Sequence, residues 1–306
     1  MSLSKGQIAR YSRQLILPEI GVTGQERLLK SAVLIVGAGG LGSPAALYLA
    51  AAGVGSLGII DEESVALSNL HRQILHISEE IGRPKAASAK ARLEALNPGV
   101  CVMPMQERLT AANATTVFSS YDVVLDGTDN FPTRYLVNDA CVLLGKPLVH
   151  VGVVHLRGQL MTVRPGRSAC FRCVFPEPPS RGAIPNCQDA GVLGTVAGIL
   201  GTLAAHEALK LLLEIGEPLL NRLLVLDGMT SRFREVQVQR DRCCAVCGEA
   251  PTIRELTELP ETACVDAQQP EIGGPGESCQ DRGPGLRALV SKSAELLCRK
   301  PTAGVT

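Results

Sequence analysis

The chain has 306 residues and no formal net charge, because 30 Lys and Arg balance 30 Asp and Glu. This balance gives no overall basic field for nucleic acid or an anionic membrane, and a chain with 3% aromatic residues and no Trp lacks base-stacking surfaces. The hydrophobic fraction of 45% is ordinary for a globular protein. We therefore expect neither a nucleic-acid nor a membrane partner.

Two further features point to the cytoplasm. Residues 1–14 contain no apolar run of the kind found in a secretory signal, and the longest apolar stretch, 192–205, is short for a bilayer span. We expect a buried helix at 192–205. Eleven cysteines, an odd number without a secretory signal, favour metal ligation or catalysis over a disulfide framework.

Strand and helix patterns alternate from residue 33 to about residue 155, which predicts a parallel sheet with crossover helices. We expect strands at 33–36, 56–61, 100–105, 121–129 and 147–154, with helices at 43–52, 85–98 and 133–145. An antiparallel strand at 158–165 and two more strands at 222–228 and 233–240 follow. The expected fold class is α/β: a Rossmann-like, doubly wound, mainly parallel sheet with an antiparallel extension.

We divide the chain into an N-terminal helical segment at 1–30, a nucleotide-binding domain at 31–248 and a linker-like tail at 249–306. Within the domain, 175–194 is rich in Pro and Gly, and so long a segment without regular structure is usually functional. The last 56 residues hold six Gly, six Pro and no aromatic residue, and we expect one short helix there, at 286–299.

A glycine loop follows the first expected strand. Residues 37–42 read Gly-Ala-Gly-Gly-Leu-Gly, and the candidate phosphate-binding positions are Gly37, Gly39, Gly40 and Gly42. Glycines allow a tight turn and a close approach of phosphate to the N-terminus of the next helix. Asp61 closes the second strand, where an acid normally holds ribose hydroxyls. A nucleotide is expected, but this pattern leaves NAD, FAD and other nucleotides open.

Cationic and polar side chains surround this loop in the sequence. Asn69, Arg72 and Lys85 follow Asp61, and Arg13 lies near the start of the chain. Two Arg and one Lys suit a polyphosphate, because Arg binds it through a bidentate fork and Lys supplies a compact charge. A dinucleotide usually relies on the helix N-terminus for its pyrophosphate. Each cation taken singly fits a solvated surface position equally well.

The sequence Asp-Gly-Thr-Asp-Asn at 126–130 places Asp126 and Asp129 at the carboxyl end of the fourth expected strand, where ligands bind in open α/β sheets. A carboxylate there suits Mg²⁺, which keeps several waters and bridges phosphate oxygens. A cap for the following helix is an equally good interpretation of one of the two carboxylates.

The cysteines divide into ligand candidates and others. Cys170 and Cys173 form one C-x₂-C pair and Cys244 and Cys247 a second, which predicts a closed structural zinc site that joins two loops. Cys243 also has a permitted spacing to Cys247, and we choose Cys244 because it repeats the spacing of the first pair.

The remaining cysteines are judged by where they fall. Cys187 lies alone in the long loop, where it suits a nucleophile or thioester site but also an ordinary loop cysteine. Cys101 and Cys141 fall inside a predicted strand and helix and are expected in the core.

The order of the motifs RYSRQ, VLIVGAGGLG, D…SNLHRQ, GRPKA, DGTDN, CFRC, NCQDAGVLG and CxxC resembles the MoeB/ThiF/HesA family over about residues 5–248. These adenylyltransferases activate small ubiquitin-like sulfur-carrier proteins and are related to ubiquitin-activating enzymes. The resemblance implies ATP at the loop around Gly40, ribose on Asp61, and zinc on the four paired cysteines. Longer relatives carry a rhodanese domain after such a linker, and we expect none in this chain.

The resemblance also assigns roles to individual residues. Asn69, Arg72 and Lys85 hold the polyphosphate, Ser68 is a further nucleotide-binding position, and Asp129 holds Mg²⁺ with Asn130 beside it. Arg13 matches an arginine that reaches across a homodimer interface into the partner's ATP site. Cys187 matches a cysteine that some relatives link covalently to the carrier.

The implied reaction is attack of the carrier's C-terminal Gly-Gly carboxylate on ATP, with release of pyrophosphate and formation of an acyl-adenylate. A separate sulfur donor, a rhodanese or a cysteine desulfurase, then yields the thiocarboxylate. The carrier remains open among molybdenum-cofactor, thiamine, tRNA-thiolation and secondary-metabolite pathways. Two rivals are an NAD-dependent dehydrogenase with structural zinc and a scaffold that binds a carrier without activating it.

Overall fold

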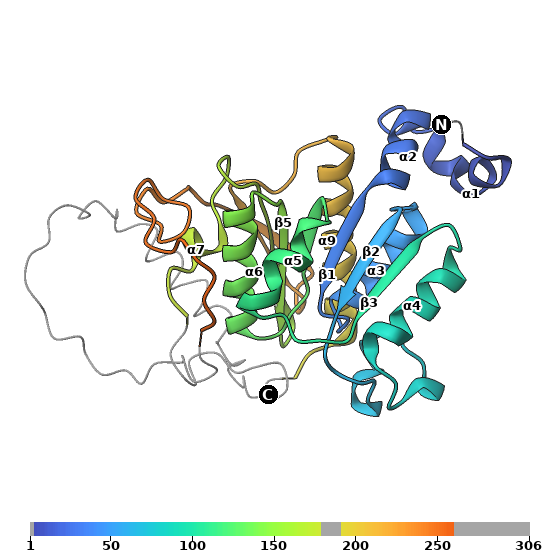
Figure 1. Cartoon of the computed structure of the whole chain (residues 1–306), viewed down its shortest axis with the longest axis horizontal. Helices are drawn as coiled ribbons and strands as arrows, with labels where there is room; N and C mark the ends of the chain where they lie inside the picture. The colour runs from blue at the N-terminus through green and yellow to red at the C-terminus, as the bar shows by residue number, and fades with distance from the viewer. Residues whose placement is uncertain (1–2, 179–190, 260–306) are drawn as a thin grey trace, which may run out of the picture.

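The centre of the molecule is an eight-stranded mixed sheet (Figure 1). The computed structural model describes residues 3–178 and 191–259. The strand order is β3-β2-β1-β4-β5-β6-β7-β8, with parallel pairing from β3 to β5 and antiparallel pairing from β5 to β8. The expected fold class, a mainly parallel Rossmann-like sheet with an antiparallel extension, is confirmed.

The strands are β1 Ala32–Val36, β2 Ser56–Ile60, β3 Cys101–Met105, β4 Val123–Asp126, β5 Leu148–Val154, β6 Arg157–Val163, β7 Arg222–Asp227 and β8 Arg232–Gln237. The helices are α1 Lys5–Leu15, α2 Gly21–Lys30, α3 Gly42–Ala52, α4 Lys85–Leu96, α5 Ala111–Ser119, α6 Phe131–Leu144, α7 Phe171–Val174 and α9 Gly194–Leu213, with short 3-10 turns η1 Leu67–Asn69 and η2 Ser78–Glu80. Helices α5 and α7 were not predicted from the sequence. The helix expected at 286–299 lies outside the described residues.

Helices cover both faces of the sheet, which explains why β1 is apolar at every position. Val33 and Ile35 belong to the core that packs α3, α4 and α9, whereas Leu34 and Val36 belong to the core that packs α5, α6 and α7. A strand buried on both faces reads as a continuous apolar run and not as an alternating one. This double burial fixes the carboxyl end of β1, and the glycine loop follows directly.

The helix expected at 192–205 is longer than predicted. Helix α9 has 20 residues and is long and apolar enough to cross a membrane by length and composition alone. It packs instead along α3, β5 and β6, and its apolar face belongs to the larger core. The prediction of a buried helix is confirmed, and its predicted length is wrong because the apolar pattern continues past His206 and Glu207 to Leu213.

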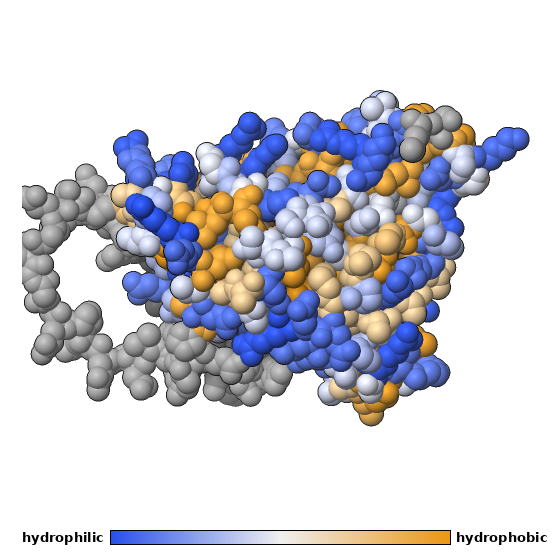
Figure 2. Space-filling view, in the orientation of Figure 1, coloured by the Kyte–Doolittle hydropathy of each residue, from blue (hydrophilic) through white to orange (hydrophobic). Residues whose placement is uncertain are grey.

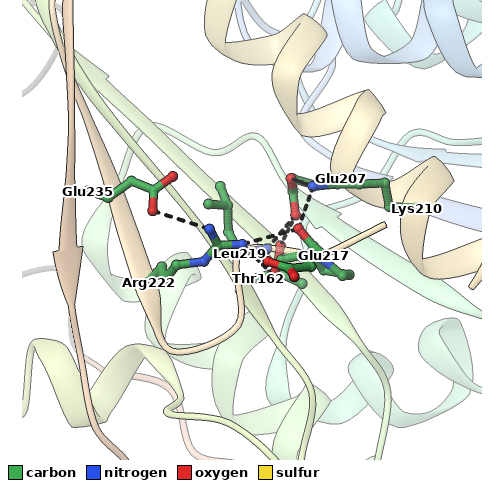
Figure 3. A network of polar contacts seen from close by, with 8 residues as sticks. Thr162, Glu207, Lys210, Glu217, Leu219, Arg222 and Glu235 are labelled. Carbon is green, nitrogen blue, oxygen red and sulfur yellow. Dashed lines mark hydrogen bonds and ion pairs between the residues drawn. The ribbon is translucent and has the colours of Figure 1, made fainter. Parts of the chain in front are cut away.

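Glu207 explains how a charged residue is tolerated inside α9. Its carboxylate accepts hydrogen bonds from Thr162 Oγ1 and from the backbone N–H of Leu219, both at 2.8 Å, and it pairs with Lys210 Nζ at 2.5 Å (Figure 3). A buried carboxylate that is hydrogen-bonded and paired avoids most of the penalty of burial. The network ties α9 to β6 and to the segment before β7.

Candidate active site

The glycine loop lies where the carboxyl ends of β1, β2 and β4 meet. Gly37 N–H donates to the carbonyl of Ile60 at 2.9 Å, and Gly127 N–H donates to that of Val36 at 3.0 Å. A Cβ at Gly42 would lie 1.9 Å from the carbonyl oxygen of Gly37, so a side chain there would collide with the loop backbone. Close packing of the loop therefore brings the ends of three strands to one place.

Asp61 holds this loop directly. Its carboxylate accepts from Ala38 N–H at 2.8 Å and from Glu63 N–H at 2.9 Å. Burial raises the pKa of Asp61, and the nearby ammonium of Lys85 opposes that rise. No described residue accepts a hydrogen bond from the N–H groups of Gly39 or Gly40. Among the described residues, these two backbone donors have no partner at the N-terminal end of α3, which is a favourable place for an anion.

Lys85 and Arg72 lie beside the loop, although they are far from it in sequence. Lys85 is the first residue of α4 and is 2% exposed, and its ammonium pairs with the Glu63 carboxylate. A Cβ added to Gly40 would lie 3.2 Å from Cγ of Arg72, which places that side chain against the loop. The structure therefore brings Asp61, Arg72 and Lys85 together around the glycines.

Ser68 and Asn69 are part of η1, which sets the course of this segment. The carbonyl of Asn69 accepts from the N–H of Arg72 at 3.1 Å and from that of Gln73 at 2.9 Å. The carbonyl of Ser68 accepts from the Arg72 guanidinium at 3.0 Å. Backbone groups of η1 therefore place Arg72 beside the glycine loop.

The loop after β4 separates the two carboxylates of the DGTDN motif. Asp126 is fully buried, and it contacts His150 Nδ1 at 2.8 Å and accepts from Thr128 Oγ1 at 2.6 Å. Asp129 is exposed. The cap of α6 is Asn130, whose Oδ1 accepts from Thr133 N–H at 2.9 Å, so the suggestion that a carboxylate caps this helix is wrong. An exposed carboxylate at a strand's carboxyl end suits a Mg²⁺ ion that keeps several waters.

Arg13 lies at the opposite end of the sheet from the glycine loop of its own chain. Helix α1 packs at the C-terminal ends of α3 and α4: Tyr11 Oη accepts from Asn97 Nδ2 at 2.9 Å, and Gln14 Nε2 donates to the carbonyl of Ala52 at 3.1 Å. The glycine loop lies at the N-terminal ends of these helices (Figure 1). The exposed Arg13 is therefore outside the site that its own chain forms.

The four cysteines of the two C-x₂-C pairs converge as expected. Their Sγ atoms all lie within 4.8 Å of one another, with 3.6 Å between Cys170 and Cys244 and 3.3 Å between Cys173 and Cys247. Tetrahedral zinc with bonds of about 2.3 Å separates its sulfurs by about 3.8 Å. The donor set and spacing therefore fit one closed zinc site, and Cys244 rather than Cys243 completes it.

Side chains of helix α6 hold α7, the short helix beside the cysteine site, in place. Asn138 Oδ1 accepts from Phe171 N–H at 2.8 Å, and Asp139 binds the Arg172 guanidinium through two bonds of 2.7 Å. Arg172 also lies over the ring of Tyr135, 4.6 Å from its centre. These contacts anchor α7, which contains Cys173 and has Cys170 as its N-cap.

Cys101 and Cys141, both expected in the core, differ in their exposure to solvent. Cys141 is buried, but Cys101 is exposed, because β3 is an edge strand of the sheet and Cys101 begins it. The prediction that Cys101 is a core residue is wrong. Cys187 lies outside the described residues.

Sequence reasoning missed several residues that build the site. His76, Gln73 and Ser88 are buried behind the glycine loop, and Thr128 and Arg134 shape the loop after β4. A polar residue at the end of an apolar stretch, as in "RQILH", is a weak signal by itself. Only the folded chain shows which of these residues contact the loop.

The model of the ThiF family matches residues 11–246. This chain belongs to the ThiF family. The chain is 49% identical over 263 residues to a protein named sulfur carrier protein adenylyltransferase from Thermus thermophilus, with 84% of this chain and 97% of that protein aligned. The resemblance seen in the sequence is thus confirmed.

Longer relatives and solved structures extend this comparison. Proteins named adenylyltransferase and sulfurtransferase MOCS3 are 49% identical in Arabidopsis thaliana and 50% identical in Sus scrofa, over 83% and 84% of this chain. The chain spans 55% and 57% of their lengths. The structure of E. coli MccB with ATP has a TM-score of 0.68 at 23% identity and covers 78% of this chain and 73% of that one. At that identity the likeness concerns the fold alone.

Proposed function

We propose that this chain is an adenylyltransferase that activates the C-terminal glycine of a small ubiquitin-like sulfur-carrier protein with ATP. The observation that carries the proposal is the grouping of Arg72 and Lys85 around a glycine loop, two of whose N–H groups have no acceptor in the described part of the chain. Such a set suits a triphosphate. The name of the Thermus thermophilus relative, which aligns over 97% of its length, supports the carrier as substrate.

The negative charges of the carrier carboxylate and of ATP decide what the site must supply for adenylation. The carrier's terminal carboxylate is ionised at neutral pH, so its attack on the α-phosphorus needs no general base. The barrier is repulsion between that carboxylate and the triphosphate. Lys85, Arg72 and the N–H groups of Gly39 and Gly40 offset this repulsion and stabilise the charge that grows on the departing pyrophosphate. Asp129 would hold Mg²⁺, which neutralises phosphate oxygens when bound.

Nucleotide preference separates this proposal from a dehydrogenase. We expect Mg·ATP to bind more tightly than NADH, because the loop is flanked by two cations beyond what a pyrophosphate needs. Fluorescence titration with NADH and competition by ATP measure the two affinities. Tight NADH binding that ATP fails to displace would favour the dehydrogenase. A protein that binds ATP and a carrier but releases no pyrophosphate would be the inactive scaffold.

We also propose a homodimer in which Arg13 of one protomer completes the partner's ATP site. Several exposed apolar side chains belong to two regions, α1 with α2 and the crossover before α4, which lie at opposite ends of the parallel strands, and Figure 2 shows apolar surface near each. These side chains are Ile8, Ile16, Leu17 and Val22 in the first group and Leu67, Ile74, Ile77 and Ile81 in the second. Contiguous exposed apolar surface commonly marks an interface. Pairing the two groups between protomers brings α1 to the partner's crossover.

Mixing two inactive variants tests this arrangement. We expect Arg13→Ala and Lys85→Met each to be inactive alone, whereas their co-expression restores about one quarter of wild-type activity, since half of the dimers are mixed and each has one intact site. Differently tagged chains allow the mixed dimer to be isolated and assayed. A mixed dimer as inactive as its parents would contradict the shared site.

The later steps are also part of the proposal. A separate donor, a rhodanese or a cysteine desulfurase, supplies the sulfur by one of two routes. Its sulfur displaces AMP from the adenylate directly, or the Cys187 thiolate displaces AMP first and the donor then attacks the resulting thioester. We place the enzyme in the cytoplasm, because a reducing compartment keeps thiolates available for zinc. We keep the division into an N-terminal helical segment at 1–30, a nucleotide-binding domain at 31–248 and a linker-like tail at 249–306.

A further inference from the structure

A buried histidine that the proposed mechanism does not use lies behind the glycine loop. His76 is 5% exposed and belongs to the crossover between β2 and α4. Its Nε2 is 3.1 Å from the carbonyl oxygen of Ala38, and its Nδ1 is 2.7 Å from Ser88 Oγ. The Ser88 hydroxyl donates to Glu80 Oε2 at 2.6 Å. His76 therefore joins the glycine loop to α4 and to the carboxylate of Glu80.

The contact to Ala38 sets the direction of a loop donor. Asp61 accepts from the N–H of Ala38, and His76 lies against its carbonyl, so the peptides on both sides of this residue are held. In a planar trans peptide the carbonyl and the following N–H point in opposite directions. With the Ala38 carbonyl turned to His76, the N–H of Gly39 points away from the imidazole. This N–H is one of the donors assigned above to the triphosphate.

The hydrogen bonds require a particular number of protons. The Ala38 carbonyl only accepts, so Nε2 of His76 must carry a proton. If Ser88 donates to an ionised Glu80, Nδ1 must donate to Ser88 and the ring is an imidazolium. If Glu80 is protonated and donates to Ser88, Ser88 donates to a neutral ring. Both arrangements hold the same number of protons. Removing one proton costs one hydrogen bond. If Ser88 still donates to Glu80 and Nδ1 donates to Ser88, an unprotonated Nε2 faces the Ala38 carbonyl and that contact is lost; if Nε2 keeps its proton, one hydroxyl proton is left for two acceptors.

We propose that His76 is a positioning residue for the ATP site, which aims the Gly39 N–H at the phosphates, and that it does so fully only while the His76–Ser88–Glu80 network keeps its shared proton. The inference rests on the proposed function. Three further charged groups act on the network: Asp61, Lys85 and Arg83, of which Arg83 pairs with the other Glu80 oxygen at 2.6 Å. Because a rising pH removes the shared proton, ATP affinity falls as the pH rises.

The charges around the ring agree with a proton that is readily lost. Burial lowers the pKa of His76, and Lys85 lowers it further, whereas the Ala38 carbonyl, Asp61 and Glu80 raise it. A lowered pKa of the imidazolium means that the ring is charged only at low pH and loses its proton as the pH rises. When the ring loses this proton, one hydrogen bond is lost, either from the ring to Ser88 or to the Ala38 carbonyl, or from Ser88 to Glu80.

Two amide variants separate the contacts of the ring. In His76→Gln the amide reaches the position of Nε2 and keeps a donor for Ala38, but it does not titrate. In His76→Asn the shorter amide reaches only the Nδ1 position and leaves the Ala38 carbonyl with only the longer bond of 3.4 Å from Ser43 Oγ. We expect Mg·ATP to bind about tenfold more weakly to His76→Asn and within about threefold of wild type to His76→Gln.

The measurement is the Kd of Mg·ATP by calorimetry, without carrier, from about pH 5.5 to about pH 8.5. Dividing each wild-type Kd by that of His76→Gln cancels the titration of ATP itself. We expect this ratio to rise with pH, which a merely structural histidine would not produce. Wild-type affinity in His76→Asn, or a ratio that is flat with pH, would overturn the inference.

The outcomes also separate this inference from the proposed function. A wild-type protein that binds no ATP would sink both. A wild-type protein that binds ATP, together with equal binding by the variants at every pH, would sink only the role of His76. Zinc content and thermal unfolding report folding, and if His76→Asn fails to fold, the pH ratio from His76→Gln decides.

Discussion

Replacing Lys85 with methionine should lower carrier-dependent pyrophosphate release at least about 100-fold, with little change in the free energy of unfolding. Methionine keeps the buried stem of a side chain that is 2% exposed and removes only the ammonium. Its ion-pair partner, Glu63, is largely solvated, with 60% of its side chain exposed, and the other carboxylate near the ammonium, Asp61, keeps its two backbone N–H donors. The loss should therefore appear in the reaction and not in the fold.

Lys90 offers a matched control for this variant. It lies on the same helix, α4, is 43% exposed, and pairs with Glu94 one turn further on at 3.4 Å. Lys90→Met removes an equal charge outside the site and should leave the rate within about twofold of wild type, since exposed pairs contribute little. Initial rates of pyrophosphate release at saturating ATP measure both variants. Near-normal turnover by Lys85→Met would refute its placement at the triphosphate.

Replacing Cys244 with serine should remove the zinc and lower the free energy of unfolding by several kcal/mol. Cys170, Cys173 and Cys247 would remain buried together without the fourth sulfur of a closed site. Metal binding that requires the folded chain contributes directly to folding, because the unfolded chain has no such site. Atomic emission gives the zinc stoichiometry, and urea unfolding gives the free energy.

Cys243 provides the comparison that tests the choice between neighbours. Cys243→Ser leaves all four converging sulfurs in place and should keep one zinc per chain. Loss of zinc from Cys243→Ser, or its retention by Cys244→Ser, would show that the assigned register is wrong. The free energy of unfolding then tells whether the bound metal supports the core around α6 and α7.

The sheet could be predicted from the sequence because its central strands are buried on both faces and are mostly apolar. The glycine loop and the paired cysteines were also visible, since backbone geometry and metal ligation restrict residue type and spacing. By contrast, the different environments of Asp126 and Asp129 depend on His150, which lies on the next strand. Local sequence contains no such information.

The same limit applies to the residues behind the loop. His76 contacts Ala38 and Ser88, which are separated from it by 38 and 12 residues, so their meeting is a property of the tertiary structure. The exposure of Cys101 follows from the position of β3 at the edge of the sheet, which depends on strand order. Periodicity identifies a strand but not its neighbours.

The central claim is that this chain adenylates a sulfur-carrier protein. Its most direct test is to mix the protein with Mg·ATP and a panel of carriers that end in Gly-Gly, to follow pyrophosphate release, and to analyse each sample by intact mass spectrometry. We expect pyrophosphate release that depends on one carrier, with the mass of an adenylate added to that carrier. Tight ATP binding without pyrophosphate release or adenylate on any carrier of the panel would contradict the account.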